Sequence, residues 1–377
     1  MTTLPRTDRS LLGRWWWTVD RWTLAALLVL FAAGAVLAMA ASPAVAERIG
    51  IDSFHFVRRQ FAFLPLALAL FLATSLLSPV GVRRLGAVGF LVALLLLMVM
   101  PLLGEEVKGA RRWVTLFGFS LQASEFVKPT FAVLAAWLFA TARLKPAFRG
   151  ELICVGLYGL VVVLLLLQPD VGMAVMVSAV WFAQFFVAGV SLTWATLLAV
   201  VGLGGAVAVY WLMPHVTDRI DRYLDPASGD SYQVDRALEA FSNGGLFGRG
   251  PGEGVVKEVL PDAHSDFVFA VAGEEFGLLA CLAILGLFAF IMLRGFARAF
   301  QEKDLFALLA VTGLLVQFGL QAILNMAVSL GLLPATGMTL PFISYGGSSL
   351  LATALGMGMV LALMRRRPEV QGLPWAV

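Results

Sequence analysis

The chain has 377 residues, of which 60% are hydrophobic and only 14% are charged, and its formal net charge is +3. This composition excludes a water-soluble domain of the same length, because such a domain needs a larger polar surface. The mean hydropathy of +0.88 and many apolar runs, near the length of roughly 20 residues that crosses a bilayer, predict an all-α polytopic membrane protein.

Ten apolar runs are candidate membrane spans, and we expect one helix for each. In chain order they are Trp22–Ser42, Phe61–Leu77, Gly86–Leu103, Phe126–Ala140, Leu152–Leu167, Val171–Val187, Leu192–Met213, Phe267–Leu293, Leu305–Val328 and Ser348–Met364. Only Gln168-Pro169-Asp170 separates the fifth run from the sixth. Because residues 152–187 are too many for one ordinary crossing, we expect a turn between two helices there.

Basic residues mark the two ends of the chain, including Arg14 and Arg365, and alternate connections between the spans, including Arg83, Arg143 and Arg294. Arginine and lysine concentrate in cytoplasmic loops, so we expect an inner-membrane protein with both termini in the cytoplasm. The expected parts are a cytoplasmic segment over 1–21, a ten-helix membrane domain over 22–364 and a cytoplasmic tail over 365–377. Tryptophans at 15, 16, 17 and 22 fit an aromatic belt at the membrane interface.

Two outer segments are unusually polar: Gly104–Ser124, and the long periplasmic loop 214–265 between the seventh and eighth spans. Long loops often carry function. Within the long loop, the glycines at 244–254 follow no strand and precede no Gly-Lys-Ser/Thr, so we expect a flexible loop and not a phosphate-binding one. No internal repeat is visible, which argues against an inverted-repeat transporter.

Cys154 and Cys281 lie in apolar runs, so we expect buried thiols and no disulfide. Cysteines and histidines lack the spacing of metal ligands, which argues against a structural zinc site. We expect no nucleic-acid partner.

Asp266 stands where the long outer loop becomes the apolar eighth span. A carboxylate at a helix N-terminus can cap the free N–H groups, which is one interpretation. In the other, Asp266 lies at the outer interface beside a lipid head group and acts as a general base toward a sugar hydroxyl. The residues alone leave both open.

Other charged residues allow two interpretations each. Glu125 and Lys128, three residues apart at the start of a span, either form a structural ion pair or bind substrate. Lys108, Arg111 and Arg112 form an outer cationic cluster that is either solvated or binds pyrophosphate oxygens.

Two further sequence strings are notable, one within the eighth span and one at the start of the tenth. Glu274 and Glu275 fall within the apolar eighth span, where carboxylates are costly and serve either pairing or function. Ser344-Tyr345-Gly346-Gly347-Ser348-Ser349 opens the last span, and its small residues favour close helix packing.

Taken in order, these strings resemble those of the FtsW/RodA family, the SEDS proteins, over nearly the whole chain. Residues 109–113 resemble G-A-x-R-W, 121–128 resemble Q-P-S-E-x-x-K with Ala123 in place of Pro, and 168–172 resemble Q-P-D-L-G. Residues 260–269 resemble L-P-E-A-H-T-D-F-I-F, with Asp262 for Glu and Ser265 for Thr. Residues 340–349 match L-P-F-I-S-Y-G-G-S-S without a departure.

The resemblance implies a peptidoglycan glycosyltransferase that polymerises lipid II and releases undecaprenyl pyrophosphate. It makes Asp266 the catalytic base. It also suggests these substrate-binding residues: Lys108, Arg111, Arg112, Glu125, Lys128, His264, Ser344, Tyr345 and Ser348. A divalent cation, Mg²⁺ or Mn²⁺, is a conceivable cofactor between the phosphates.

The pair Ala263-His264 and the Trp-rich start are more similar to the division branch, FtsW, than to RodA. This implies action at the division septum, with a class B penicillin-binding protein and other divisome membrane proteins as partners. The alternatives are a lipid II transporter and a non-enzymatic divisome scaffold. Because the distinctive residues crowd the expected outer face, the enzyme is favoured over the transporter.

Overall fold

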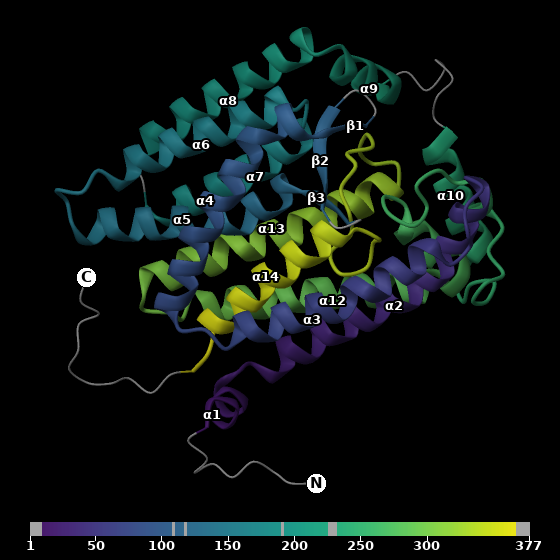
Figure 1. The fold of residues 1–377 in the computed structure, drawn as a ribbon, viewed down its shortest axis with the longest axis horizontal. Helices are drawn as coiled ribbons and strands as arrows, with labels where there is room; N and C mark the ends of the chain where they lie inside the picture. The colour runs from purple at the N-terminus through teal and green to yellow at the C-terminus, as the bar shows by residue number, and fades with distance from the viewer. Residues whose placement is uncertain (1–9, 108–109, 117–118, 190–191, 225–231, 367–377) are drawn as a thin grey trace.

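A computed structural model describes residues 10–107, 110–116, 119–189, 192–224 and 232–366 (Figure 1). The first seven helices are α1 (Leu11–Thr18), α2 (Arg21–Arg48), α3 (His55–Ser75), α4 (Pro79–Leu103), α5 (Ala123–Leu144), α6 (Gly150–Leu167) and α7 (Val171–Val187). The others are α8 (Leu192–Leu212), α9 (Pro214–Leu224), α10 (Tyr232–Gly244), α11 (Val256–Val259), α12 (Val268–Ala299), α13 (Leu305–Ser329) and α14 (Gly347–Leu363). The strands are β1 (Glu105–Val107), β2 (Ala110–Leu116) and β3 (Phe119–Gln122).

Among the described residues, seven helices are long and apolar enough to cross a membrane: α2, α3, α4, α5, α6, α12 and α13. Three shorter apolar helices, α7, the Val200–Leu212 part of α8, and α14, coincide with the other expected spans. The polytopic helical fold is therefore confirmed, whereas the count of ten crossings stays a prediction. The expected turn at 168–170 is present, because α6 ends at Leu167 and α7 begins at Val171.

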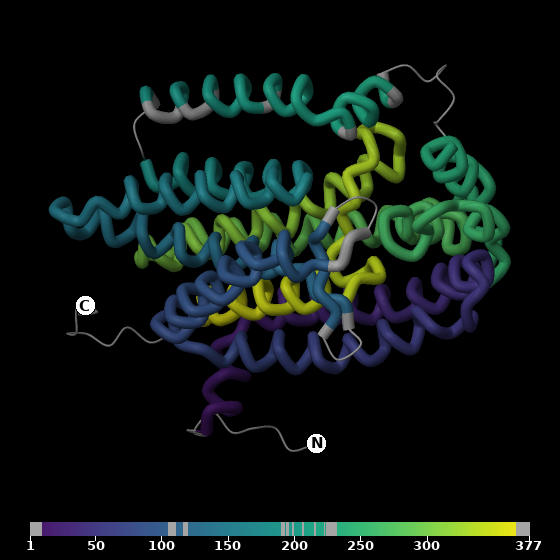
Figure 2. The backbone as a smooth tube through the Cα atoms, turned by 45° about the horizontal axis from the view of Figure 1, so that its top comes forward, coloured from purple at the N-terminus to yellow at the C-terminus, as the bar shows by residue number. Residues whose placement is uncertain are grey.

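The helices pack lengthwise into one bundle, with α8 along an edge (Figure 2). In the most hydrophobic windows of α5 and α13, 78% and 72% of the residues are buried, so these two helices form the interior. The same window of α5 has a mean hydropathy of only 1.2, against 2.6 for α2. Polar side chains are thus carried into the middle of the bundle on α5.

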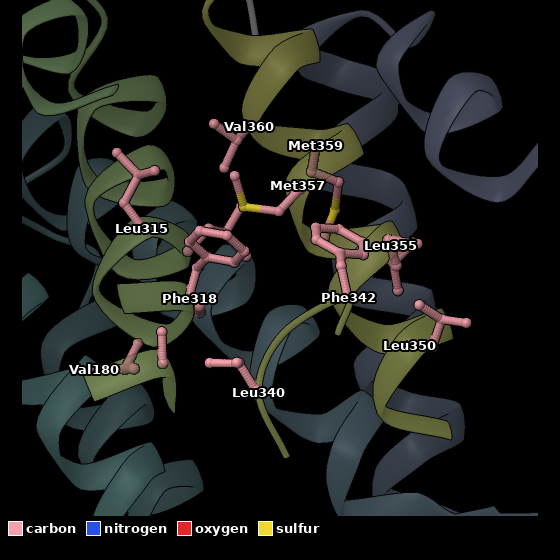
Figure 3. Packing of buried hydrophobic residues seen from close by; sticks show 14 of the residues in the cluster. Val180, Leu315, Phe318, Leu340, Phe342, Leu350, Leu355, Met357, Met359 and Val360 are labelled. Carbon is pink, nitrogen blue, oxygen red and sulfur yellow. The ribbon is translucent and has the colours of Figure 1, made fainter. Parts of the chain in front are cut away.

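The core next to the last span packs two phenylalanines, Phe318 and Phe342, among aliphatic and methionine side chains (Figure 3). Phe342 is 1% exposed, and its ring centroid lies 4.3 Å from that of Phe31 and 6.1 Å from that of Phe318. Its φ of +65° is strained for a side-chain-bearing residue. A Cβ on Gly34 of α2 would lie 2.0 Å from the Phe342 carbonyl oxygen, so only glycine admits this approach. The contact fixes the 340–344 segment deep in the bundle.

The outer segment Gly104–Ser124 forms an antiparallel sheet in the order β1-β2-β3, which the sequence analysis did not predict. Trp113 pairs with Glu105 on one side and with Gln122 on the other. Because α5 begins at Ala123, immediately after β3, the sheet sets where Glu125 and Lys128 enter the bundle.

The long outer loop contains α9, α10 and α11, and its Gly-rich part is packed against α12. The expectation of a flexible loop is therefore wrong. A Cβ on Gly244 would lie 1.9 Å from the Gly273 carbonyl oxygen, and one on Gly248 would lie 2.2 Å from that of Glu275. The glycines here permit close backbone approach.

Glu274 and Glu275 hold this segment in place. Glu274 accepts hydrogen bonds from the backbone N–H groups of Val255 and Val256, both at 3.0 Å. Glu275 forms an ion pair with Lys257 and accepts a 2.9 Å hydrogen bond from the Gly252 N–H. Of the two interpretations offered by the sequence, the structure shows the pairing one.

Candidate active site

Asp266 lies in the loop between α11 and α12 and is half-buried. Its backbone N–H donates to the Asp262 carbonyl at 3.0 Å, which closes a tight turn around Asp262 at φ +52°. Helix α12 begins at Val268, and Phe267 occupies the N-cap position. Asp266 therefore lies one residue before the N-cap of α12.

Helix α13 fixes the position of Asp266 through its backbone. The side-chain amide of Asn325 donates to the Asp266 carbonyl at 2.9 Å and to the Met338 carbonyl at 2.7 Å. A Cβ built on Gly337 would lie 4.0 Å from an Asp266 carboxylate oxygen. The carboxylate thus lies beside the 337–338 backbone. Asn325 was not predicted as a site residue.

His264, Ser344 and Tyr345 bind the same loop to the segment before α14. The Ser344 hydroxyl donates to the Ser265 carbonyl at 2.5 Å and accepts from the Leu340 N–H at 2.7 Å. The Tyr345 N–H donates to the His264 carbonyl at 2.9 Å. These residues hold the Asp266 loop in shape.

The His264 ring is buried between aromatic rings. Its centroid lies 4.6 Å from that of Phe56, to which it stacks, and 5.0 Å from that of Tyr345. Burial lowers the pKa of His264 to about 4, although the Asp262 charge opposes the shift. The imidazole is therefore neutral at pH 7.

Glu125 and Lys128 form a buried ion pair at 2.9 Å, as one interpretation of their spacing predicts. The Lys128 ammonium also donates to the Gln321 side-chain oxygen at 3.0 Å, and the Gln321 amide donates to the Thr339 carbonyl at 3.0 Å. Gln321 and Asn325 are one turn apart on α13. Gln321 thus links Lys128 to Thr339, and Asn325 links the Asp266 loop to Met338, the residue next to it.

The cations of the outer cluster differ in their surroundings. Arg112 donates to the Gln168 carbonyl at 2.8 Å and to the Pro169 carbonyl, and it lies 3.7 Å from the Asp170 carboxylate. It thereby fixes the α6–α7 turn. Arg111 is exposed and donates to the Pro101 carbonyl at 3.4 Å. Lys108 lies outside the described residues.

Ser348 and Asp170 join the sheet to the bundle. The Ser348 hydroxyl accepts from the Gln122 N–H at 3.0 Å and donates to the Ser120 carbonyl at 3.2 Å. Asp170 accepts from the Gln122 side-chain amide at 3.4 Å and from the Met173 N–H at 3.5 Å. Sequence reasoning did not single out Asp170, although it is part of the Gln-Pro-Asp string.

Both cysteines are buried and free, as expected. Within the described ranges, no group of three or more His, Cys, Asp or Glu side chains is placed to hold a metal ion.

Comparison with known proteins places these features in a family. A family model described as "Cell cycle protein", for FtsW, RodA and SpoVE, matches residues 21–369. Relatives named "Probable peptidoglycan glycosyltransferase FtsW" occur in Caulobacter vibrioides, at 47% identity over 78% of this chain and 76% of that protein, and in Coxiella burnetii, at 38% over 74% and 77%.

Two solved structures share the fold. One is described as "Structural coordination of polymerization and crosslinking by a peptidoglycan synthase complex"; a chain in it has a TM-score of 0.71 and 30% identity, over 92% of this chain and 97% of that one. The rod shape determining protein RodA of Thermus thermophilus has a TM-score of 0.67 and 29% identity, over 93% and 97%. The chain belongs to the FtsW/RodA/SpoVE family.

Proposed function

We propose that this protein is a peptidoglycan glycosyltransferase that polymerises lipid II into glycan strands at the division septum. The relatives named FtsW support this activity and the division branch. The observation that carries the proposal is the placement of Asp266. Its backbone is held by Asn325, and its carboxylate lies beside Gly337, one residue before the N-cap Phe267. A carboxylate so placed can accept a proton.

In the proposed reaction Asp266 takes the proton of the acceptor sugar hydroxyl. The hydroxyl oxygen forms a bond to the anomeric carbon of the donor, and the bond from that carbon to the pyrophosphate oxygen breaks. The electron pair leaves with undecaprenyl pyrophosphate, whose developing negative charge needs cations nearby.

The surroundings of the cations suggest different roles for them. Arg111 is exposed on β2 and can meet a pyrophosphate, with Lys108 as its neighbour in sequence. Arg112 and Lys128 are engaged with Asp170 and Glu125. We assign these two pairs to holding the α6–α7 turn and the start of α5 around the substrate.

A divalent cation such as Mg²⁺ or Mn²⁺ would arrive with the pyrophosphate in this proposal. Phosphate oxygens are its preferred ligands, and the described residues contain no metal-binding cluster of their own. Bound there, it would neutralise charge on the leaving group.

The partner we propose is a class B penicillin-binding protein, with other divisome membrane proteins. Support comes from the solved relative that is described as part of a peptidoglycan synthase complex. We place the protein in the inner membrane with both termini in the cytoplasm. In support, the Arg366 N–H donates to the Thr18 carbonyl at 3.1 Å, so the two ends of the described chain meet at one end of the bundle.

A lipid II transporter and a non-enzymatic scaffold remain the alternatives. The test is polymerisation of lipid II by the purified protein with its partner, comparing wild type with Asp266→Asn. If Asp266→Asn makes no glycan chains but still binds lipid II, the proposed glycosyltransferase activity is supported. Unchanged polymerisation by Asp266→Asn contradicts the assignment of Asp266 as the base. If the wild type does not polymerise lipid II, the proposed activity itself is contradicted.

A further inference from the structure

Where α1 meets the end of α14, arginines from four parts of the chain converge on one region of the surface. This basic cluster consists of Arg14, Arg21, Arg294, Arg298, Arg365 and Arg366. The Arg365 side chain donates to the Thr18 hydroxyl at 3.0 Å. Arg365 lies close enough to Arg14, and Arg366 close enough to Arg298, for electrostatic repulsion between the two guanidinium groups of each pair. Like charges are thus brought together by the fold.

One buried carboxylate organises the cluster without neutralising it. Asp20 is 3% exposed and accepts two hydrogen bonds from Arg294, at 2.7 and 2.8 Å. Arg298 lies 3.1 Å from the same carboxylate. Since Asp20 supplies a single negative charge to two arginines, the cluster keeps a surplus of positive charge.

Exposed aromatic and aliphatic side chains border the basic cluster. Helix α1 is capped by Ser10 and carries exposed Leu11, Leu12, Trp16 and Trp17. Trp22, at the start of α2, is 67% exposed. The Arg21 guanidinium lies over the rings of Trp16 and Trp17, at 5.0 and 4.9 Å from their centroids. Tryptophan beside arginine at the end of a spanning helix is typical of the head-group level of a bilayer.

We propose that the basic cluster and α1 together form a binding site for an anionic phospholipid. Guanidinium groups match phosphate oxygens bidentately, and the tryptophan and leucine side chains suit the adjoining glycerol and acyl chains. An acidic peptide would use the charges but not the exposed apolar band. The site lies at the opposite end of the bundle from β1–β3 and α10 and takes no part in the proposed chemistry (Figure 1).

The test uses the full-length purified protein after delipidation. Native mass spectrometry with added phosphatidylglycerol or phosphatidylcholine measures the affinity for each lipid. The wild type should prefer phosphatidylglycerol. Each arginine near a lipid surface contributes about fivefold, so Arg14→Gln combined with Arg366→Gln should weaken phosphatidylglycerol binding roughly 30-fold. These changes keep the backbone hydrogen bonds of both residues.

The matched control is Arg84→Gln with Arg149→Gln, two other exposed arginines, in the first turns of α4 and immediately before α6. Binding should be unchanged in the control and largely retained when Arg14 and Arg366 become lysine. Equal affinity of the wild type for the two lipids would overturn the proposal. So would an equal loss in the control pair, or equally tight binding of soluble glycerol 3-phosphate, which would indicate a phosphate site without a lipid.

Discussion

The hydrogen bonds of Asn325 predict that this residue positions the catalytic loop. Both bonds run from its side-chain amide to backbone carbonyls, so only the NH₂ group can make them. Asn325→Ala leaves the carbonyls of Asp266 and Met338 without these donors. An unsatisfied buried acceptor costs about 1–3 kcal/mol, so the loss of both donors should lower the free energy of unfolding by roughly 2–6 kcal/mol.

The effect on catalysis should exceed that expected from stability alone. Once the tie to α13 is lost, the Asp266 carboxylate can shift by about 1 Å, which is enough to slow a reaction about 10²-fold. Lipid II polymerisation, measured below the melting temperature of the variant, should fall by about that factor. Binding of lipid II should persist, because the base acts in the transition state.

Two variants sharpen this test. Asn325→Asp keeps the shape but cannot donate when ionised, so it should lose activity like the alanine variant. Ser329→Ala removes a contact of 3.5 Å to the same Asp266 carbonyl and should change both stability and activity little. If Asn325→Ala polymerises within about threefold of the wild type, the inferred coupling between α13 and Asp266 is wrong.

Three other outcomes are expected. Lys128→Met strands the buried Glu125 carboxylate and should cost about 3–5 kcal/mol in denaturation experiments, most of it recovered by adding Glu125→Gln; an unshifted single variant argues against the ion pair. Burial holds the pKa of His264 near 4, whereas it is about 6.5 in the unfolded chain, so the unfolded chain binds a proton first as the pH falls. The free energy of unfolding should therefore fall by about 3 kcal/mol between pH 6.5 and 4. In melting curves at several pH values, His264→Gln should remove most of this pH dependence. In spheroplasts an impermeant thiol reagent should label Ser242→Cys but not Ala142→Cys; the reverse pattern contradicts the proposed orientation.

The helices could be predicted because long apolar runs have few alternatives in a membrane. The sheet β1–β3 was not predicted, because its strands are only 3, 7 and 4 residues long and the alternation of β3 is too short to stand out. The glycines of 244–254 suggested flexibility, since sequence does not show which backbone a glycine lets approach. In the structure, Gly244 packs against the Gly273 carbonyl and Gly248 against the Glu275 carbonyl, so this segment is held against α12.

The site was predicted in part. Asp266 and the Glu125–Lys128 pair stood out because charges are rare in apolar surroundings. Gln321 and Asn325 were missed because averaging over an apolar span hides neutral polar side chains. Their spacing of four residues within α13 was a usable signal, since such amides need partners in the bundle. The ring contacts that help to bury His264 join α3, the Asp266 loop and the segment before α14, which no local string reveals.

The central claim is that the Asp266 carboxylate is the general base. Asn has nearly the same shape and can keep the backbone bond to Asn325, but it cannot accept the proton at neutral pH. The most direct measurement is therefore glycan-chain formation from lipid II by Asp266→Asn and by the wild type, each with its partner. Both are assayed at one temperature, after melting curves have shown that the two proteins are equally stable. We predict a loss of about 10²–10⁴-fold with lipid II binding intact. Polymerisation by Asp266→Asn at close to the wild-type rate would contradict the claim.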